Sequence, residues 1–132
     1  MQSYVLMLQT DVDDIYITES ALSEIGNTIP VQFISNLEEM EQHVANNGEP
    51  AVILLNDRGT MNRGLQVLKK LKTNAAYAHI PVVMLGEYTT SDYIKEIYKA
   101  GANTYIVKPS SVAATKKKIE TFFSYWFEVA AT

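Results

Sequence analysis

The 132-residue sequence contains no cysteine, which excludes disulfide scaffolds, zinc sites built on thiolates and thiol catalysis. It also lacks any apolar run near the roughly 20 residues that a membrane-spanning helix needs. The apolar stretch Tyr4–Leu8 is too short for a secretory signal. The net charge of −4 offers no broad basic surface for nucleic acid. These absences predict a soluble, cytoplasmic protein with no nucleic-acid or membrane partner.

The composition is that of an ordinary folded protein. Apolar residues make up 47% of the chain and charged residues 20%. A chain of this length buries enough surface to need no disulfide or metal for stability. No linker, charge block or internal repeat divides it, so we expect one domain over residues 1–132 with no output domain.

Five short apolar runs recur along the chain: Tyr4–Leu8, Val31–Ile34, Ala51–Leu55, Pro81–Leu85 and Thr104–Val107. Continuous apolar runs of this length are expected for strands that are buried on both faces of a parallel sheet. A segment with helix signals follows each run. This alternation predicts an α/β fold in which a five-stranded parallel sheet carries helices on both faces.

The expected helices have recognisable ends. Asn36 is a good N-cap for the second helix, since an acid follows three residues later. Thr90 or Ser91 is a candidate N-cap for the fourth helix, and Ser110 or Ser111 for the fifth. Gly26 is a natural stop for the first helix and Gly101 for the fourth. A helix often ends at a glycine because glycine readily adopts the left-handed conformation.

In an open sheet of this kind, functional residues lie at the carboxyl ends of the strands. Those ends are residues 8–14, 55–59, 85–88 and 107–109. The residues in and around them resemble the receiver domains of two-component signalling, the CheY-like family. The resemblance rests on Gly101–Pro109, on Ile80–Leu85, and on Asp13 and Asp14 followed by Ala21 and Leu22. It implies a (βα)5 flavodoxin-like fold with strand order 2-1-3-4-5.

The resemblance also implies a phosphorylation site. Such receivers hold Mg²⁺ with two acids after the first strand, and an aspartate at the end of the third strand accepts the phosphoryl group. A hydroxyl after the fourth strand then binds the phosphoryl oxygens. In this sequence the acid pair falls on Gln9 and Thr10, counted back from Ala21. The acceptor position falls on Asn56 and the hydroxyl position on Gly86. An amide lacks the anionic oxygen that attacks phosphorus, so we expect no phosphorylation there and no cofactor.

Three elements of the implied site are kept. Lys108 matches the family's phosphate-pairing lysine, Pro109 follows it, and Tyr105 matches the aromatic switch residue. The resemblance implies a cis peptide bond before Pro109. Lys108 needs a new partner, for which we consider Asp57, a carboxylate of the first loop, or the side-chain carbonyl of Asn56.

An alternative is that phosphorylation takes place at a neighbouring residue. Asp57 stands beside Asn56, and a functional phosphoacceptor at Asp57 would need Mg²⁺ held by Asp11 and Asp13. Adjacent residues on a strand point to opposite faces, which argues against Asp57 in the same pocket. Acids near a helix start, including Asp14, are also favoured simply by the helix dipole. The favoured interpretation is therefore a non-enzymatic, phosphorylation-independent receiver.

Aromatic residues point to a protein partner. The last helix carries Phe122, Phe123, Tyr125, Trp126 and Phe127. A core-facing stripe at helical spacing includes Ile119, Phe122, Phe123 and Trp126, but it cannot cover all five aromatics. Tyr88, Tyr98 and Tyr105 lie in the same half of the chain. We expect a partner surface on the fourth helix, fifth strand and fifth helix, used by a histidine kinase, another protein of phosphorelay signalling, or a second copy.

Overall fold

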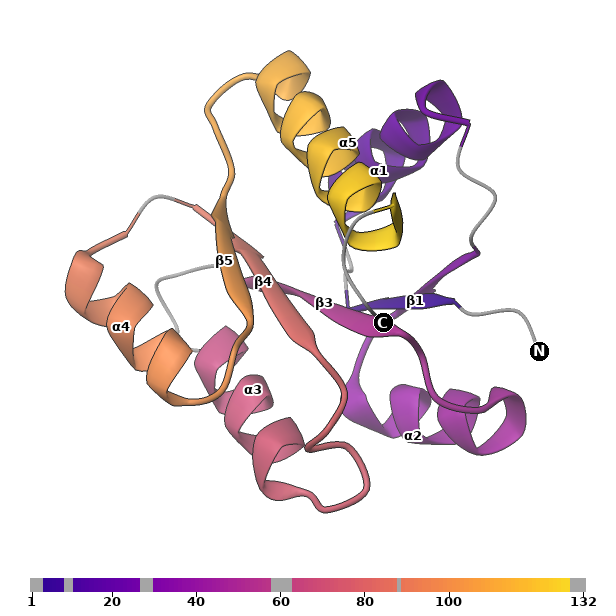
Figure 1. The fold of residues 1–132 in the computed structure, drawn as a ribbon, viewed down its shortest axis with the longest axis vertical. Coiled ribbons are helices and arrows are strands. Elements are labelled where there is room, and N and C mark those ends of the chain that lie inside the picture. The colour runs from indigo at the N-terminus through magenta and orange to yellow at the C-terminus, as the bar shows by residue number, and fades with distance from the viewer. Residues whose placement is uncertain (1–3, 9–10, 27–29, 58–62, 88, 129–132) are drawn as a thin grey trace.

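The computed structural model of the chain describes residues 4–8, 11–26, 30–57, 63–87 and 89–128, and Figure 1 shows the arrangement of its elements. The strands are β1 (Val5–Leu8), β2 (Val31–Ile34), β3 (Val52–Asp57), β4 (Val82–Gly86) and β5 (Thr104–Val107). The helices are α1 (Val12–Glu24), α2 (Leu37–Asn47), α3 (Arg63–Thr73), α4 (Ser91–Lys99) and α5 (Val112–Glu128). None of these helices, as far as they are described, is long and apolar enough to cross a membrane.

The five strands form one parallel sheet in the order β2-β1-β3-β4-β5, which confirms the predicted topology. Helices α1 and α5 lie on one face of the sheet, and α2, α3 and α4 lie on the other (Figure 1). Both faces are therefore covered, which explains why the inner strands β1, β3 and β4 begin as continuous apolar runs, whereas the edge strand β2 carries the exposed Gln32.

The core consists of two hydrophobic clusters, one on each face of the sheet. Along β3, Leu55 belongs to the cluster beneath α2, α3 and α4, whereas Leu54 belongs to the cluster beneath α1 and α5. β3 runs two residues beyond its predicted end, so the same alternation extends to Asn56 and Asp57. Asn56 is thereby directed to the α1 face and Asp57 to the α3–α4 face.

Helix ends follow the predicted capping residues. The side chains of Asn36, Thr90 and Ser111 each accept a hydrogen bond from the backbone N–H three residues later, at 2.8, 3.2 and 3.1 Å. Gly26 and Gly101 follow the C-caps of α1 and α4 with φ of 66° and 111°. These left-handed conformations favour glycine, so the two helices end where the sequence predicts.

The aromatic residues of α5 divide between the core and the surface. Phe123 and Trp126 are buried in the cluster beneath α1 and α5, together with Ile119, and Phe122 packs against this cluster from its edge. Tyr125 is 56% exposed. The predicted core-facing stripe is confirmed, and at least one aromatic ring of α5 lies outside it.

The Phe123→Ala substitution is expected to lower the free energy of unfolding by about 3–5 kcal/mol, because the ring is almost fully buried and its removal leaves a cavity. Urea unfolding followed by far-ultraviolet circular dichroism measures this loss. Tyr125→Ala on the same helix is the matched control and is expected to change the value by less than about 0.5 kcal/mol. Equal losses for the two variants would contradict the assigned orientation of α5.

Candidate functional site

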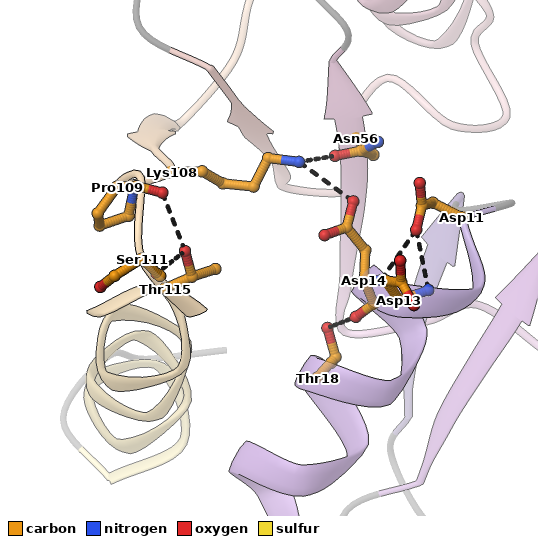
Figure 2. A network of polar contacts seen from close by, with 9 residues as sticks. All are labelled: Asp11, Asp13, Asp14, Thr18, Asn56, Lys108, Pro109, Ser111 and Thr115. Carbon is orange, nitrogen blue, oxygen red and sulfur yellow. Dashed lines mark hydrogen bonds and ion pairs between the residues drawn. The ribbon is translucent and has the colours of Figure 1, made fainter. Parts of the chain in front are cut away.

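Three side chains from distant parts of the chain meet at the carboxyl end of the sheet. The Nζ atom of Lys108 lies 3.2 Å from Oδ1 of Asn56 at the end of β3 and 3.2 Å from Oδ2 of Asp14 on α1 (Figure 2). The Lys108 and Asp14 side chains are only 15% and 21% exposed. Of the partners considered for Lys108, a first-loop acid and the Asn56 carbonyl are both present.

The start of α1 brings Asp14 to this place. Asp11 is the N-cap of α1, and its Oδ1 accepts hydrogen bonds from the backbone N–H groups of Asp13 at 2.9 Å and Asp14 at 3.2 Å. Asp14 is therefore the third residue of the helix, where a carboxylate is also favoured by the helix dipole. Figure 2 shows Asp11 turned back onto the helix start and Asp14 directed towards Lys108.

The metal-binding alternative placed Mg²⁺ on Asp11 and Asp13. Asp11 acts here as the N-cap of α1. Within the described ranges, no three His, Asp or Glu side chains are grouped so that they could hold a metal ion. Gln9 and Thr10, the positions of the family's acid pair, lie outside the described residues.

The expectation of a cis bond before Pro109 is wrong, because the described chain contains no cis peptide. The Lys108 N–H donates a hydrogen bond of 2.7 Å to the Gly86 carbonyl, which extends the pairing of β5 with β4 by one residue. The Pro109 carbonyl then accepts a hydrogen bond of 3.2 Å from Oγ1 of Thr115 on α5 (Figure 2). The peptide bond between Lys108 and Pro109 is trans, the isomer that is intrinsically favoured by about 0.5–1 kcal/mol.

Asp57 lies on the other face of the sheet and is 1% exposed. Its Oδ2 accepts a hydrogen bond from the Tyr93 hydroxyl at 2.9 Å and lies 3.4 Å from the Tyr105 hydroxyl. The Tyr105 hydroxyl also lies 3.2 Å from the Glu87 carbonyl. Asp57 is therefore part of a buried polar cluster with Tyr93 and Tyr105, and it does not contact Lys108 in any described interaction.

The tyrosines of this cluster have altered acidity. Burial and the nearby Asp57 carboxylate raise the pKa of Tyr105 to about 12. The same causes, with burial again the larger, raise the pKa of Tyr93 well above its usual value. Both hydroxyls therefore stay protonated near neutral pH. The Tyr93 hydroxyl donates to Asp57, whereas the single proton of the Tyr105 hydroxyl is shared between Asp57 and the Glu87 carbonyl.

Gly86 borders the Asp57 cluster. A Cβ atom at this glycine would lie 2.3 Å from the Tyr105 hydroxyl oxygen and 3.1 Å from the Asp57 backbone carbonyl. The space that a side chain would take at Gly86 thus holds the Tyr105 hydroxyl, and Tyr105 is buried at 8% exposure. At Gly86, where the resemblance places the family's hydroxyl residue, the Tyr105 hydroxyl fills the space of a side chain.

The predicted partner surface contains exposed side chains, and some of its polar groups are already hydrogen-bonded within the chain. Tyr98 is 45% exposed, and its hydroxyl accepts a hydrogen bond of 3.0 Å from the Tyr105 backbone N–H. A largely apolar groove runs between β5 and α5, and its lining includes Tyr125 and Lys117. Tyr88 lies outside the described residues.

Sequence reasoning missed Tyr93 as a partner of Asp57. Its position on α4 is 36 residues from Asp57 along the chain. The only local signal is that Tyr93 lies three residues after the Thr90 cap, which fixes its place in the first turn of α4 but not what it contacts.

Comparison with known proteins places these features in a family. Residues 7–120 match the response regulator receiver domain family. The chain is 32% identical over 77 residues to the probable methanogenesis regulatory protein FilR2 of Methanothrix harundinacea, covering 58% of this chain and 50% of that protein. It is 29% identical over 104 residues to the chemotaxis protein CheY1 of Helicobacter pylori strain 26695, covering 79% of this chain and 83% of that protein.

The fold matches solved structures along its whole length. The response regulator from Hahella chejuensis superposes with a TM-score of 0.84 at 24% identity, and the match covers 99% of each chain. At this identity the likeness concerns the fold alone. The first of the curated relatives is matched over only half of its length, whereas the Helicobacter protein is matched over most of its length.

A double-mutant cycle tests the ion pair at the site. Asp14→Asn, Lys108→Met and the double variant are expected to give a coupling of about 1–2 kcal/mol in the free energy of unfolding, because the pair is largely shielded from water. The exposed His79–Glu49 pair is the control, with side chains 60% and 51% exposed. A Lys108–Asp14 coupling no larger than that of the control would contradict the structural role of the pair.

Proposed function

Because this chain belongs to the family of response regulator receiver domains, we propose that it is a receiver that takes no phosphoryl group and acts by binding a protein partner. The observation that carries the proposal is the amide of Asn56 at the end of β3, hydrogen-bonded to Lys108. The family's attacking group at this place is a carboxylate. An amide has no anionic oxygen and forms no acyl phosphate.

The donor set around Lys108 does not fit Mg²⁺. A magnesium ion prefers anionic oxygen ligands in near-octahedral geometry. Asn56 offers a neutral oxygen, and Gln9 and Thr10 are neutral by residue type. Asp14 is a carboxylate, but the ammonium of Lys108 already balances its charge. Lys108 and Asp14 together thus make an internally neutral pair where phosphoryl transfer needs a metal and a nucleophile.

The partner surface that we propose is formed by α4, β5 and α5. The groove beside β5 combines Phe122 and Tyr125 with Lys117 and Lys118 on α5. Two outward backbone groups of the edge strand are already used: the Tyr105 N–H by Tyr98, and the Val107 carbonyl by Lys118 Nζ at 2.8 Å. Added strand pairing is thereby hindered, so the partner binds through side-chain contacts in the groove.

The proposed setting is two-component phosphorelay signalling, with the chain as a non-enzymatic receiver module. The partner that we propose is a histidine kinase or another signalling protein, and a second copy of the chain is the alternative. The basic rim of the groove favours an acidic or amphipathic segment on the partner.

Incubation with acetyl phosphate, with and without Mg²⁺, is expected to leave the intact mass of the protein unchanged, because the acceptor carboxylate is absent. Asn56→Asp alone is also expected to stay unlabelled, since that change restores no second acid for the metal. Intact-protein mass spectrometry measures both, with a receiver that has the full acid set as the positive control. The matched variant combines Gln9→Glu, Thr10→Asp, Asn56→Asp and Gly86→Thr.

Two results would contradict the proposal. A Mg²⁺-dependent adduct on the unaltered chain would show phosphoacceptor chemistry, and its loss in Asp57→Asn would place that chemistry at Asp57. Strong labelling of Asn56→Asp alone would show that the chain's own oxygen ligands suffice for the metal.

A further inference from the structure

The buried carboxylate of Asp57 has no use in the proposed function, yet it joins three elements. It ends β3, receives the Tyr93 hydroxyl from α4 and lies beside the Tyr105 hydroxyl from β5. A buried charge is costly unless it is hydrogen-bonded. The two hydroxyls contribute to that bonding only while both rings point into the protein.

Two glycines make room for the cluster. A Cβ at Gly64, in the first turn of α3, would lie 2.6 Å from Oδ1 of Asp57, and a Cβ at Gly86 would lie 2.3 Å from the Tyr105 hydroxyl. Real Cβ atoms do not approach so closely, so a side chain at either position would displace the carboxylate or the tyrosine. The carboxylate also lies against the start of α3, where the helix dipole favours negative charge.

The attachment of α4 depends on this cluster. α4 has nine residues, and Ile97 is its fully buried side chain. Tyr93 and Ile94 pack against the same core cluster, and two polar links add to them: Tyr93 to Asp57, and the Tyr98 hydroxyl to the Tyr105 backbone. A short helix with one fully buried side chain relies in part on such polar contacts to stay closed.

We infer that Asp57 is a conformational clamp, which holds Tyr93 and Tyr105 turned inward and so fixes the α4–β5 surface in one arrangement without a phosphoryl group. The clamp itself rests on the geometry around Asp57. Its meaning for partner binding rests on the proposed function, since α4 and β5 are part of the proposed partner surface. Turning Tyr105 outward would leave the Asp57 carboxylate buried with one donor fewer, which disfavours a second state.

Hydrogen exchange of the backbone amides of residues 91–100 tests the clamp in the isolated protein, without phosphodonor or partner. Tyr93→Phe and Tyr105→Phe each remove one hydroxyl from a charged acceptor and are expected to speed exchange in α4 by about tenfold or more. Tyr4→Phe is the matched control, because Tyr4 is as buried as Tyr105 and its hydroxyl donates to the Gly48 carbonyl at 2.6 Å. It is expected to leave α4 exchange unchanged.

A second variant tests the space at Gly86. Gly86→Ala is expected to displace the Tyr105 ring, seen as loss of the nuclear Overhauser contact between that ring and the Hα atoms of residue 86 and its neighbours. Unchanged α4 exchange in both Tyr→Phe variants, or a retained inward ring in Gly86→Ala, would overturn the clamp. These measurements are independent of acetyl phosphate labelling. Labelling that persists in Asp57→Asn would refute the proposed function and leave the clamp standing, and unchanged α4 exchange in the Tyr→Phe variants of an unlabelled chain would do the reverse.

Discussion

Neighbouring side chains on a strand point to opposite faces of the sheet, and the arrangement of this site depends on that alternation at the end of β3. Asn56 points to the α1 face and meets Lys108 there, while Asp57 points to the α3–α4 face and meets Tyr93. Pairing of Asn56 with Leu85 and of Asp57 with Gly86 in β4 fixes both positions. A shift of one residue would exchange the two environments and place a charge beside Lys108 and an amide beneath α4.

The fold and the division between the two faces could be predicted from the sequence because both follow from local patterns. Apolar runs identify the strands, and caps such as Asn36 identify the helix starts. Alternation along β3 correctly separated Asp57 from the position of Asn56. The sequence also limited the expected partners of Lys108 to Asp57, a carboxylate of the first loop and the side-chain carbonyl of Asn56. Choosing Asp14 within that set needs the exact start of α1, which the Asp11 cap fixes to a single residue.

Other features depend on distances between elements that are far apart in the sequence. The contact of Tyr93 with Asp57 depends on how α4 sits on the sheet, and no spacing in the sequence encodes it. From the sequence, Gly86 was expected only to lack a hydroxyl. In the structure, the Tyr105 hydroxyl lies in the space that a side chain at Gly86 would take. The trans bond before Pro109 differs from what the resemblance implies, and no local pattern in the sequence indicates it.

These features concern where the charged groups at the end of β3 lie on the two faces of the sheet. At position 56 a neutral amide leaves Lys108 to be paired by Asp14, so the pocket holds its own counter-ion. At position 57 a carboxylate lies where the cluster beneath α4 is otherwise apolar, and two tyrosine hydroxyls compensate it. A carboxylate one residue further along a strand lies on the opposite face of the sheet, so it contacts different residues. Beside Lys108 it would face the pocket at the carboxyl end of the sheet, whereas beneath α4 it is buried and accepts a hydrogen bond from Tyr93.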